Sequence, residues 1–159
     1  MAIMDSGERR EFETGAVRDV GLNKGRCDLL PLSVLSGLFQ DNIFANIDLY
    51  VRTGDINHLI SVITHFSVKW VGSLESAMIE VSKHFEEGAM NYSERNWEKG
   101  IPLHCYIDSA VRHYLKLKRE DDDERHDRAF LWNILCALWT HINKPEMIDL
   151  PFAEKGEDK

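Results

Sequence analysis

Apolar residues recur every three to four positions along most of the chain, a period that predicts helices rather than strands. Two short amphipathic segments are expected within 32–53. Asp55 is a suitable N-cap for a third helix, whose apolar stripe occupies 56–66. Ser73 is expected to cap a long helix over 74–92, because an acidic residue follows it in the first turn and one face is apolar.

The second half of the chain continues the helical pattern after a compact turn over 93–102, which contains Gly100 and Pro102. A helix is expected from about His104 to Lys118, followed by an acidic break. The final helix is expected from about Glu124 to His141. It is apolar on nearly all sides and should therefore lie at the centre of the fold. The pattern predicts an all-α protein, a compact multi-helix bundle.

The two ends of the chain lack this periodicity. Residues 1–14 are polar and are expected to be flexible. Residues 15–31 are rich in glycine and basic side chains, which indicates an irregular N-terminal arm. Its cations either contact phosphate or are solvated. Residues 146–159 read as a polar C-terminal tail, which leaves one helical domain over 15–145.

Composition restricts the class of partner. The 159 residues include 27 acidic and 19 basic side chains, a formal charge of −8, which weighs against binding to duplex nucleic acid. The odd number of cysteines, three, argues against a disulfide framework. The charged N-terminus is unlike a signal peptide, and no apolar run approaches the roughly 20 residues that span a bilayer. We expect a soluble cytoplasmic protein that has no membrane partner.

Candidate chemistry lies in acidic residues at helical spacing. Glu124 and Asp127 form an ExxD pair, which would project from one side of a helix and could share a cation. Acidic residues at a helix start also serve the helix dipole, which is the simpler interpretation. Glu87 and Asp108, on two other helices, could complete a four-carboxylate site for Mg²⁺ or Mn²⁺. Basic residues close by in sequence could meet a phosphate chain.

Two blocks of sequence resemble a known family. They are GAVRD with KGRCDLLP, within Gly15–Pro31, and HFEEGAMNYSERNWEKGIPLHCYIDSAVRHY with DDDERHDRAFLWN, within His84–Asn133. Both are similar to the phage and bacterial dATP/dGTP diphosphohydrolases, the MazZ-type enzymes. These are related to the all-α, MazG-like nucleotide pyrophosphohydrolases. The resemblance therefore implies a MazG-like fold, a divalent metal, and hydrolysis of dGTP or dATP to monophosphate and pyrophosphate.

The resemblance also assigns roles to residues. Glu124 and Asp127 match the ExxD metal pair, but the EExxE signature is broken, since Met90 stands where its third glutamate belongs. We therefore complete the metal set with Glu87 and Asp108, and expect Glu87 or Glu124 to accept the proton of the attacking water.

The remaining candidates are expected to bind the substrate. Arg112 and Arg128 would stabilise charge on the leaving pyrophosphate. Tyr92 or Trp97 would stack on the base, and Asn96 would read its edge. The full substrate-binding set is Lys24, Arg26, Tyr92, Asn96, Trp97, Lys99, Arg112, His113 and Arg128. Relatives with small helical units often pair to complete a cleft, so we expect a homo-oligomer.

Three alternatives remain open. In the first, His126 and Asp127 form an HD doublet of a metal phosphohydrolase, completed by His84, His104 or His113 and by Asp149. In the second, the protein sequesters a nucleotide without turnover. In the third, it is a helical structural module whose acidic residues are only solvated.

Overall fold

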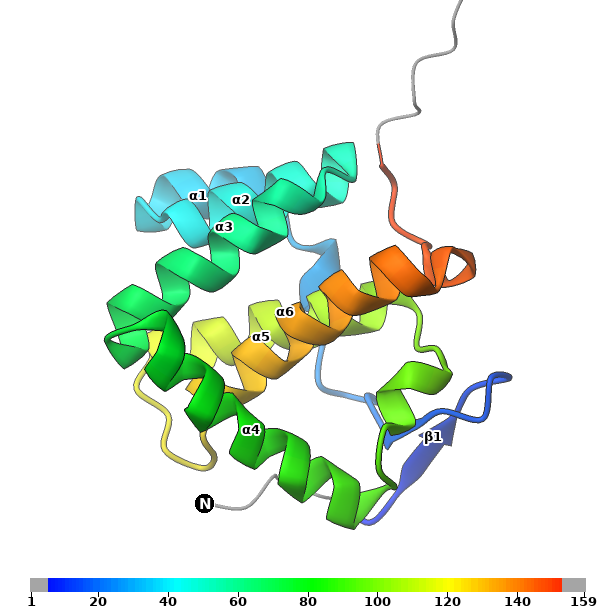
Figure 1. Cartoon of the computed structure of the whole chain (residues 1–159). Helices are drawn as coiled ribbons and strands as arrows, with labels where there is room; N and C mark the ends of the chain where they lie inside the picture. The colour runs from blue at the N-terminus through cyan, green and yellow to red at the C-terminus, as the bar shows by residue number, and fades with distance from the viewer. Residues whose placement is uncertain (1–5, 153–159) are drawn as a thin grey trace, which may run out of the picture.

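The computed structural model describes residues 6–152 as a bundle of helices with one small β-hairpin (Figure 1). The α-helices are α1 (Leu32–Phe39), α2 (Asn42–Thr53), α3 (Ile56–Phe66), α4 (Leu74–Asn91), α5 (Leu103–Lys118) and α6 (His126–Asn143). The predicted all-α class is therefore confirmed. Within the described part of the chain, no helix has both the length and the apolar character needed to cross a bilayer.

The helix starts follow the capping residues that the sequence offers. The side chain of Asp55 accepts a hydrogen bond of 2.9 Å from the backbone N–H of Asn57 at the start of α3. Ser73 accepts one of 3.1 Å from Ser76 at the start of α4. Helix α2 ends at Gly54, whose φ of 71° is accessible to glycine at little cost. Both predicted N-caps are confirmed.

Helices α5 and α6 pack side by side at the centre, with α1 to α3 on one side and α4 on another (Figure 1). The rings of Phe66 in α3 and Phe130 in α6 lie 4.3 Å apart, and Tyr114 of α5 lies 5.2 Å from Phe130. All three side chains are fully buried. The predicted central position of the last helix is confirmed, because burial of an all-round apolar helix requires neighbours on every side.

One predicted boundary is wrong in a way that affects the site. Helix α6 begins at His126 rather than at Glu124. Arg125 has φ −81° and ψ 83°, outside the helical region, so no helical turn includes Glu124. Glu124 and Asp127 therefore do not occupy two positions of one helix, and the spacing argument for the ExxD pair fails.

The N-terminal region is more ordered than predicted. Strand β1 (Arg9–Glu11) pairs antiparallel with β2 (Val17–Asp19), with Arg9 opposite Asp19. A turn closes the hairpin, in which Gly15 has φ 84°. After β2 the arm is irregular, apart from one 3₁₀ turn, η1 (Cys27–Leu29). The expectation of flexibility therefore does not hold for the strand in 6–14, and residues 1–5 lie outside the described chain.

The described part of the C-terminal segment also packs against the bundle. A 3₁₀ turn, η4 (Pro145–Met147), follows α6, and Phe152 places its ring 5.5 Å from that of Tyr50 in α2. Apolar side chains of this stretch that pack against the core explain this contact: Ile148, Leu150 and Phe152. The predicted polar tail thus contains an anchored part, and residues 153–159 lie outside the described chain.

Candidate active site

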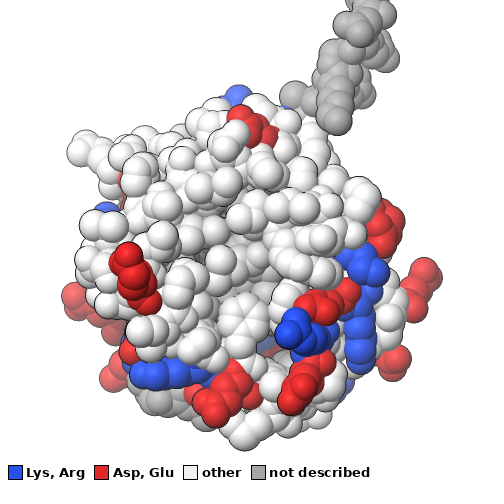
Figure 2. All heavy atoms as spheres, in the orientation of Figure 1, with Lys and Arg blue, Asp and Glu red and all other residues white. Residues whose placement is uncertain are grey.

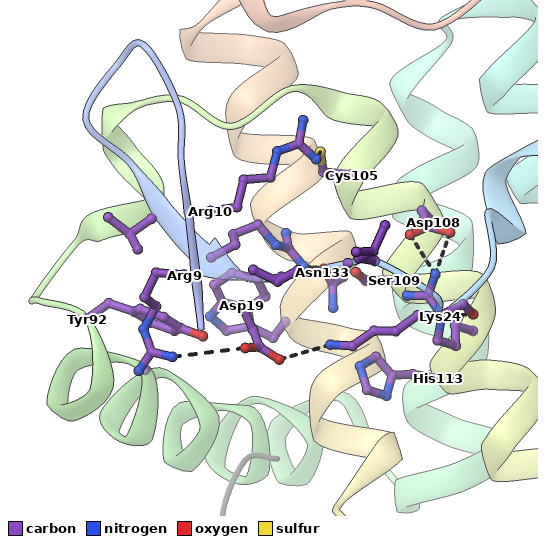
Figure 3. Close-up of a pocket in the computed structure, with 18 of the residues that line it drawn as sticks. Arg9, Arg10, Asp19, Lys24, Tyr92, Cys105, Asp108, Ser109, His113 and Asn133 are labelled. Atoms are coloured by element: carbon purple, nitrogen blue, oxygen red, sulfur yellow. Dashed lines mark hydrogen bonds and ion pairs between the residues drawn. The ribbon is translucent and has the colours of Figure 1, made fainter. Parts of the chain in front are cut away.

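A pocket of about 890 Å³ opens between the β-hairpin, the irregular arm, the C-terminal half of α4, one face of α5, and the first half of α6 with the loop before it (Figure 3). A volume of this size is typical of small-molecule and cofactor sites. The pocket brings together segments from both ends of the domain, since Arg9 and Asn133 both line it.

The lining is basic although the protein is acidic. Seven cationic side chains face four carboxylates in the pocket, whereas the whole chain carries a charge of −8. The cations are Arg9, Arg10, Arg18, Lys24, Arg26, Arg112 and Lys116, and the acids are Asp19, Asp108, Asp123 and Glu124. On the face shown in Figure 2, charged side chains gather along the lower and right margins, and most of the upper surface is uncharged. A concave surface with this excess of cations attracts polyanions.

Arg18, in strand β2, is held in the pocket wall by contacts with α5 and α6. Its Nη2 donates hydrogen bonds of 2.9 Å to Ser109 Oγ and 3.1 Å to Asn133 Oδ1. Its guanidinium also lies over the rings of Tyr106 and Trp132, at 5.2 and 5.6 Å. The Nη1 atom is buried and has no hydrogen-bond partner within residues 6–152. A buried donor without a partner is costly, so this nitrogen is suited to an anionic ligand.

A chain of charges crosses the pocket from the hairpin to the arm (Figure 3). Asp19 lies between Lys24, at 2.9 Å, and Arg9, at 4.0 Å. The guanidinium of Arg9 lies 4.9 Å from the ring centroid of Tyr92, at the end of α4. Burial raises the pKa of Asp19, but the hydrogen bonds from Ser6 and Lys24 outweigh it and lower this pKa overall. Asp19 therefore stays ionised and holds the two cations at the pocket wall.

Asp108 fastens the irregular arm to α5. Both of its carboxylate oxygens accept hydrogen bonds of 2.7 Å from Arg112, one turn further along the helix. Asp108 Oδ1 also accepts the backbone N–H of Cys27 at 2.6 Å, and Arg112 donates to the carbonyl of Gly25 at 2.7 Å. The Asp108–Arg112 pair thus supplies hydrogen-bond partners to backbone groups of the arm. These bonds account for the position of the arm over the pocket.

Two histidines meet at the inner end of the pocket. His113 Nδ1 in α5 lies 2.9 Å from His126 Nδ1, at the start of α6. Glu124 Oε1 lies 3.5 Å from the first nitrogen and 3.8 Å from the second. Burial, with a contribution from the neighbouring positive charges, places the pKa of His113 well below its ordinary value. His84, also in the pocket lining, has its pKa lowered to about 4, first by burial and then by Arg18.

The four carboxylates predicted to bind metal are not gathered. Asp108 and Glu124 line the pocket, whereas Glu87 and Asp127 lie outside its lining. Asp127 accepts two hydrogen bonds from Arg125, at 3.0 and 2.7 Å, so both of its oxygens are engaged. Because Asp108 is engaged in the same way by Arg112, these four carboxylates do not together form the all-oxygen site that Mg²⁺ prefers.

The predicted substrate-binding residues divide into two groups. Six line the pocket, namely Lys24, Arg26, Tyr92, Asn96, Arg112 and His113. Trp97, Lys99 and Arg128 lie outside the lining. Trp97 packs edge-on to Trp139, with ring centroids 5.0 Å apart, so it anchors the η3 turn (Asn96–Lys99) in the bundle. Arg128 donates to Glu80 at 2.6 and 3.0 Å, which directs it toward α4.

Asn96 lines the pocket, but its amide serves the fold. Its Oδ1 accepts the backbone N–H of Val17 at 2.8 Å, and its Nδ2 donates to the carbonyl of the same residue at 2.7 Å. The side chain thus takes the place of a neighbouring strand beside β2. The amide oxygen and nitrogen that were expected to read a base edge are therefore both hydrogen-bonded to the hairpin.

Sequence reasoning missed several residues of the pocket. Arg9 and Arg10 fell in the segment expected to be flexible, and no period identifies a three-residue strand. Ser109 and Asn133 lie inside helices, where short polar side chains carry no functional signal of their own. Arg18 belongs to the glycine-rich, basic segment 15–31, but its contact with Asn133 spans 115 positions and cannot be predicted from spacing.

The fold and the pocket define an all-α protein with a basic, nucleotide-sized cavity. The family model of the N-terminal region of dATP/dGTP diphosphohydrolases matches residues 56–150. The chain belongs to this family, and the predicted resemblance is confirmed. The matched segment contains α3 to α6 but not the hairpin. No curated protein and no solved structure matches the chain. The family name indicates nucleotide hydrolysis.

Proposed function

We propose that the pocket binds a purine deoxynucleoside triphosphate, dGTP or dATP, and hydrolyses it to the monophosphate and pyrophosphate. The observation that carries the proposal is the excess of cations in the lining, seven against four carboxylates, in a chain of net charge −8. Such a local reversal of sign is costly unless an anion compensates it, and a triphosphate supplies that anion. Family membership supports the same class of reaction.

The phosphate chain would lie against the hairpin. Arg18 offers its buried Nη1, and Lys24 and Arg9 already flank Asp19 on the same wall. Arginine suits this task because its planar fork can bind two phosphate oxygens at once. Arg112 is fixed by Asp108 and by the arm, and would contribute charge from α5.

The base would lie on the aromatic part of the lining. Tyr92 and Trp132 both line the pocket, and Tyr92 is half-buried beside Arg9. A flat purine gains more from stacking on such rings than a pyrimidine does, because it covers more of their surface. Of the two residues predicted to stack on the base, Tyr92 is therefore the one proposed, since Trp97 lies outside the lining.

Hydrolysis would proceed by attack of water on the α-phosphorus. The oxygen–phosphorus bond forms as the bridge between the α- and β-phosphates breaks, and pyrophosphate leaves with the electron pair. Glu124 would accept the proton of the water, since it lines the pocket and Glu87 does not. A divalent cation, Mg²⁺ or Mn²⁺, is proposed to be required, and when bound it would neutralise charge on the phosphates.

The proposal is tested with a panel of ribo- and deoxynucleoside triphosphates incubated with the protein and Mg²⁺ or Mn²⁺. Products are separated by ion-exchange chromatography, and pyrophosphate is distinguished from phosphate by ³¹P NMR. We expect monophosphate and pyrophosphate in equal amounts, fastest from dGTP or dATP, and loss of turnover in Glu124→Gln. Recovery of intact nucleotide from a tight complex would replace hydrolysis by sequestration. Release of single phosphates would contradict the proposed bond.

We also propose that the protein is a homo-oligomer whose second copy covers α1. This helix exposes Val34, Leu38 and Phe39 at 54, 72 and 44% of their surface, which forms an apolar strip. Phe39 packs on one side against Phe44, with ring centroids 5.3 Å apart. Light scattering during size-exclusion chromatography is expected to give a mass above 18.4 kDa, and Leu38→Glu is expected to shift it toward that value. A wild-type mass of one chain would contradict the proposal.

A further inference from the structure

The histidine pair at the inner end of the pocket brings two ring nitrogens and a carboxylate oxygen close together. Two Nδ1 atoms, of His113 and His126, face each other at 2.9 Å, and the Oε1 of Glu124 completes a triangle with both. These three ligand atoms lie within 4.8 Å of one another. The side chains of His126 and Glu124 are 0 and 9% exposed, so the triangle is largely shielded from water.

The spacing suits coordination of a single ion. Bonds of about 2.1 Å, typical of imidazole nitrogen and carboxylate oxygen on transition metals, place neighbouring ligand atoms roughly 3.0–3.4 Å apart. The three observed separations, 2.9, 3.5 and 3.8 Å, lie around that interval. Small side-chain rotations would bring all three atoms to one ion, and no backbone change is needed.

A hydrogen bond on the far side of the His126 ring also supports metal binding by this triangle. The other ring nitrogen of His126, Nε2, lies 2.6 Å from Asp123 Oδ1, which accepts its hydrogen. This bond leaves the Nδ1 lone pair directed at His113 and Glu124. A carboxylate behind a metal-binding histidine is a recurring arrangement, because it fixes the ring and increases its basicity.

We propose that His113, Glu124 and His126 bind one divalent transition-metal ion. Two imidazoles and one carboxylate favour Mn²⁺, Co²⁺ or Zn²⁺ over Mg²⁺, which prefers oxygen donors. The ion would lie beside the pocket lining, with coordination positions open toward a molecule bound in the pocket. The binding site is argued from geometry alone, whereas its participation in hydrolysis depends on the proposed function.

A neighbouring group competes for the same histidine. Asp121 and Asp123 also place carboxylate oxygens close to His126. Both oxygens of Asp121, however, accept hydrogen bonds from Arg119, at 2.7 and 2.5 Å. Asp123 is exposed and its Oδ2 lies 3.5 Å from Lys116. The triangle with Glu124 is therefore the better site, and the two groups are separable by mutation.

The HD interpretation used His126 with different carboxylates. Asp127 is engaged by Arg125, and Asp149 forms an ion pair with His104. Neither belongs with His126 to a three-ligand group in residues 6–152. The triangle keeps His126 and one of the three further histidines considered in that interpretation, His113, but takes its carboxylate, Glu124, from the loop before α6.

The test is titration of the chelator-treated full-length protein with Co²⁺, without nucleotide, followed by visible absorption and by calorimetry. We expect one Co²⁺ per chain, with absorption bands that indicate nitrogen and oxygen ligands. Glu124→Gln and His113→Gln should each weaken binding at least tenfold, and Asp123→Asn by about 10- to 100-fold through loss of the support behind His126. Mg²⁺ at equal concentration should not displace the Co²⁺.

Two variants serve as matched controls. Asp121→Asn removes a ligand of the competing group, and His58→Gln removes an imidazole on α3, outside both groups. Both should bind Co²⁺ as the wild type does, and circular dichroism checks that every variant is folded. The site is overturned if folded wild-type protein binds no Co²⁺, or if Asp121→Asn abolishes binding while Glu124→Gln leaves it unchanged.

These results are distinct from failure of the proposed function. Pyrophosphate release from dGTP by a protein that binds no Co²⁺ would overturn this site and leave hydrolysis standing. Co²⁺ binding to the triangle in a protein that returns every nucleotide intact would support the site and contradict the hydrolysis.

Discussion

Replacing Asn96 by alanine distinguishes two roles for this residue. The sequence suggested that its amide reads a base edge, whereas the structure engages that amide with the backbone of Val17. Two hydrogen bonds, of 2.8 and 2.7 Å, are lost in Asn96→Ala. Each such bond contributes about 0.5–1.5 kcal/mol, so the free energy of unfolding should fall by about 1–3 kcal/mol.

The same change should loosen the hairpin that carries Arg9 and Arg18. We expect KM to rise by a similar factor for every nucleotide that is turned over, because the phosphate-binding wall is shared. Amide hydrogen exchange at Val17 should accelerate strongly. Urea denaturation and kinetics with dGTP, dATP and a pyrimidine deoxynucleotide measure these effects.

Asn91→Ala is the matched control, since this exposed asparagine lies at the end of α4, one turn before η3. It should leave stability and exchange at Val17 unchanged. If Asn96→Ala keeps wild-type stability and changes only the ratio of purine to pyrimidine turnover, then Asn96 reads the base and the argument from its hydrogen bonds is refuted.

Three further predictions follow from single contacts. Arg18→Met should raise KM for triphosphates about tenfold or more, because the triphosphate loses the buried guanidinium nitrogen that would bind it. An unchanged KM in steady-state kinetics would contradict this. Burial lowers the pKa of His84 to about 4, so its ring is neutral in the fold, whereas the unfolded chain binds a proton near the ordinary pKa of about 6.5. The contribution of His84 to the free energy of unfolding should therefore fall by about 2 kcal/mol between pH 7 and 5. Urea melts should show this loss reduced in His84→Gln, and an equal loss in both proteins would exclude His84 as its cause. Gly54→Ala should destabilise the protein by about 1–2 kcal/mol, because φ at this position is 71° and a Cβ would lie 2.8 Å from the ring of Phe152. Gly37→Ala, on α1, would place its Cβ in open space and should stabilise the protein by about 0.5–1 kcal/mol. Equal shifts of the melting temperature in the two variants would contradict the strain argument.

The helices were predictable because their signals are local. Asp55 and Ser73 act on amides two or three residues ahead, and the apolar period defines which face each helix buries. The last helix was placed at the centre from its all-round apolar character alone. Its start was misplaced by two residues, since in the acidic run before it Asp121 is hydrogen-bonded to Arg119 and Asp123 to His126, and the run forms no helical turn.

The site was predictable only in part, because it depends on contacts between distant segments. Six proposed substrate-binding residues line the pocket, but the hairpin that closes it has strands of three residues and no readable period. The metal hypothesis joined carboxylates by helical spacing, yet Asp108 and Asp127 are engaged by arginines on their own segments. Ion pairs with nearby arginines therefore occupy two carboxylates that the spacing had suggested as metal ligands.

Hydrolysis in water enriched in ¹⁸O measures the central claim most directly. The account predicts that dGTP or dATP gives one ¹⁸O in the monophosphate and none in the pyrophosphate, because water attacks the α-phosphorus. Label in pyrophosphate or in free phosphate, or recovery of unlabelled intact triphosphate after prolonged incubation with excess protein, would contradict it.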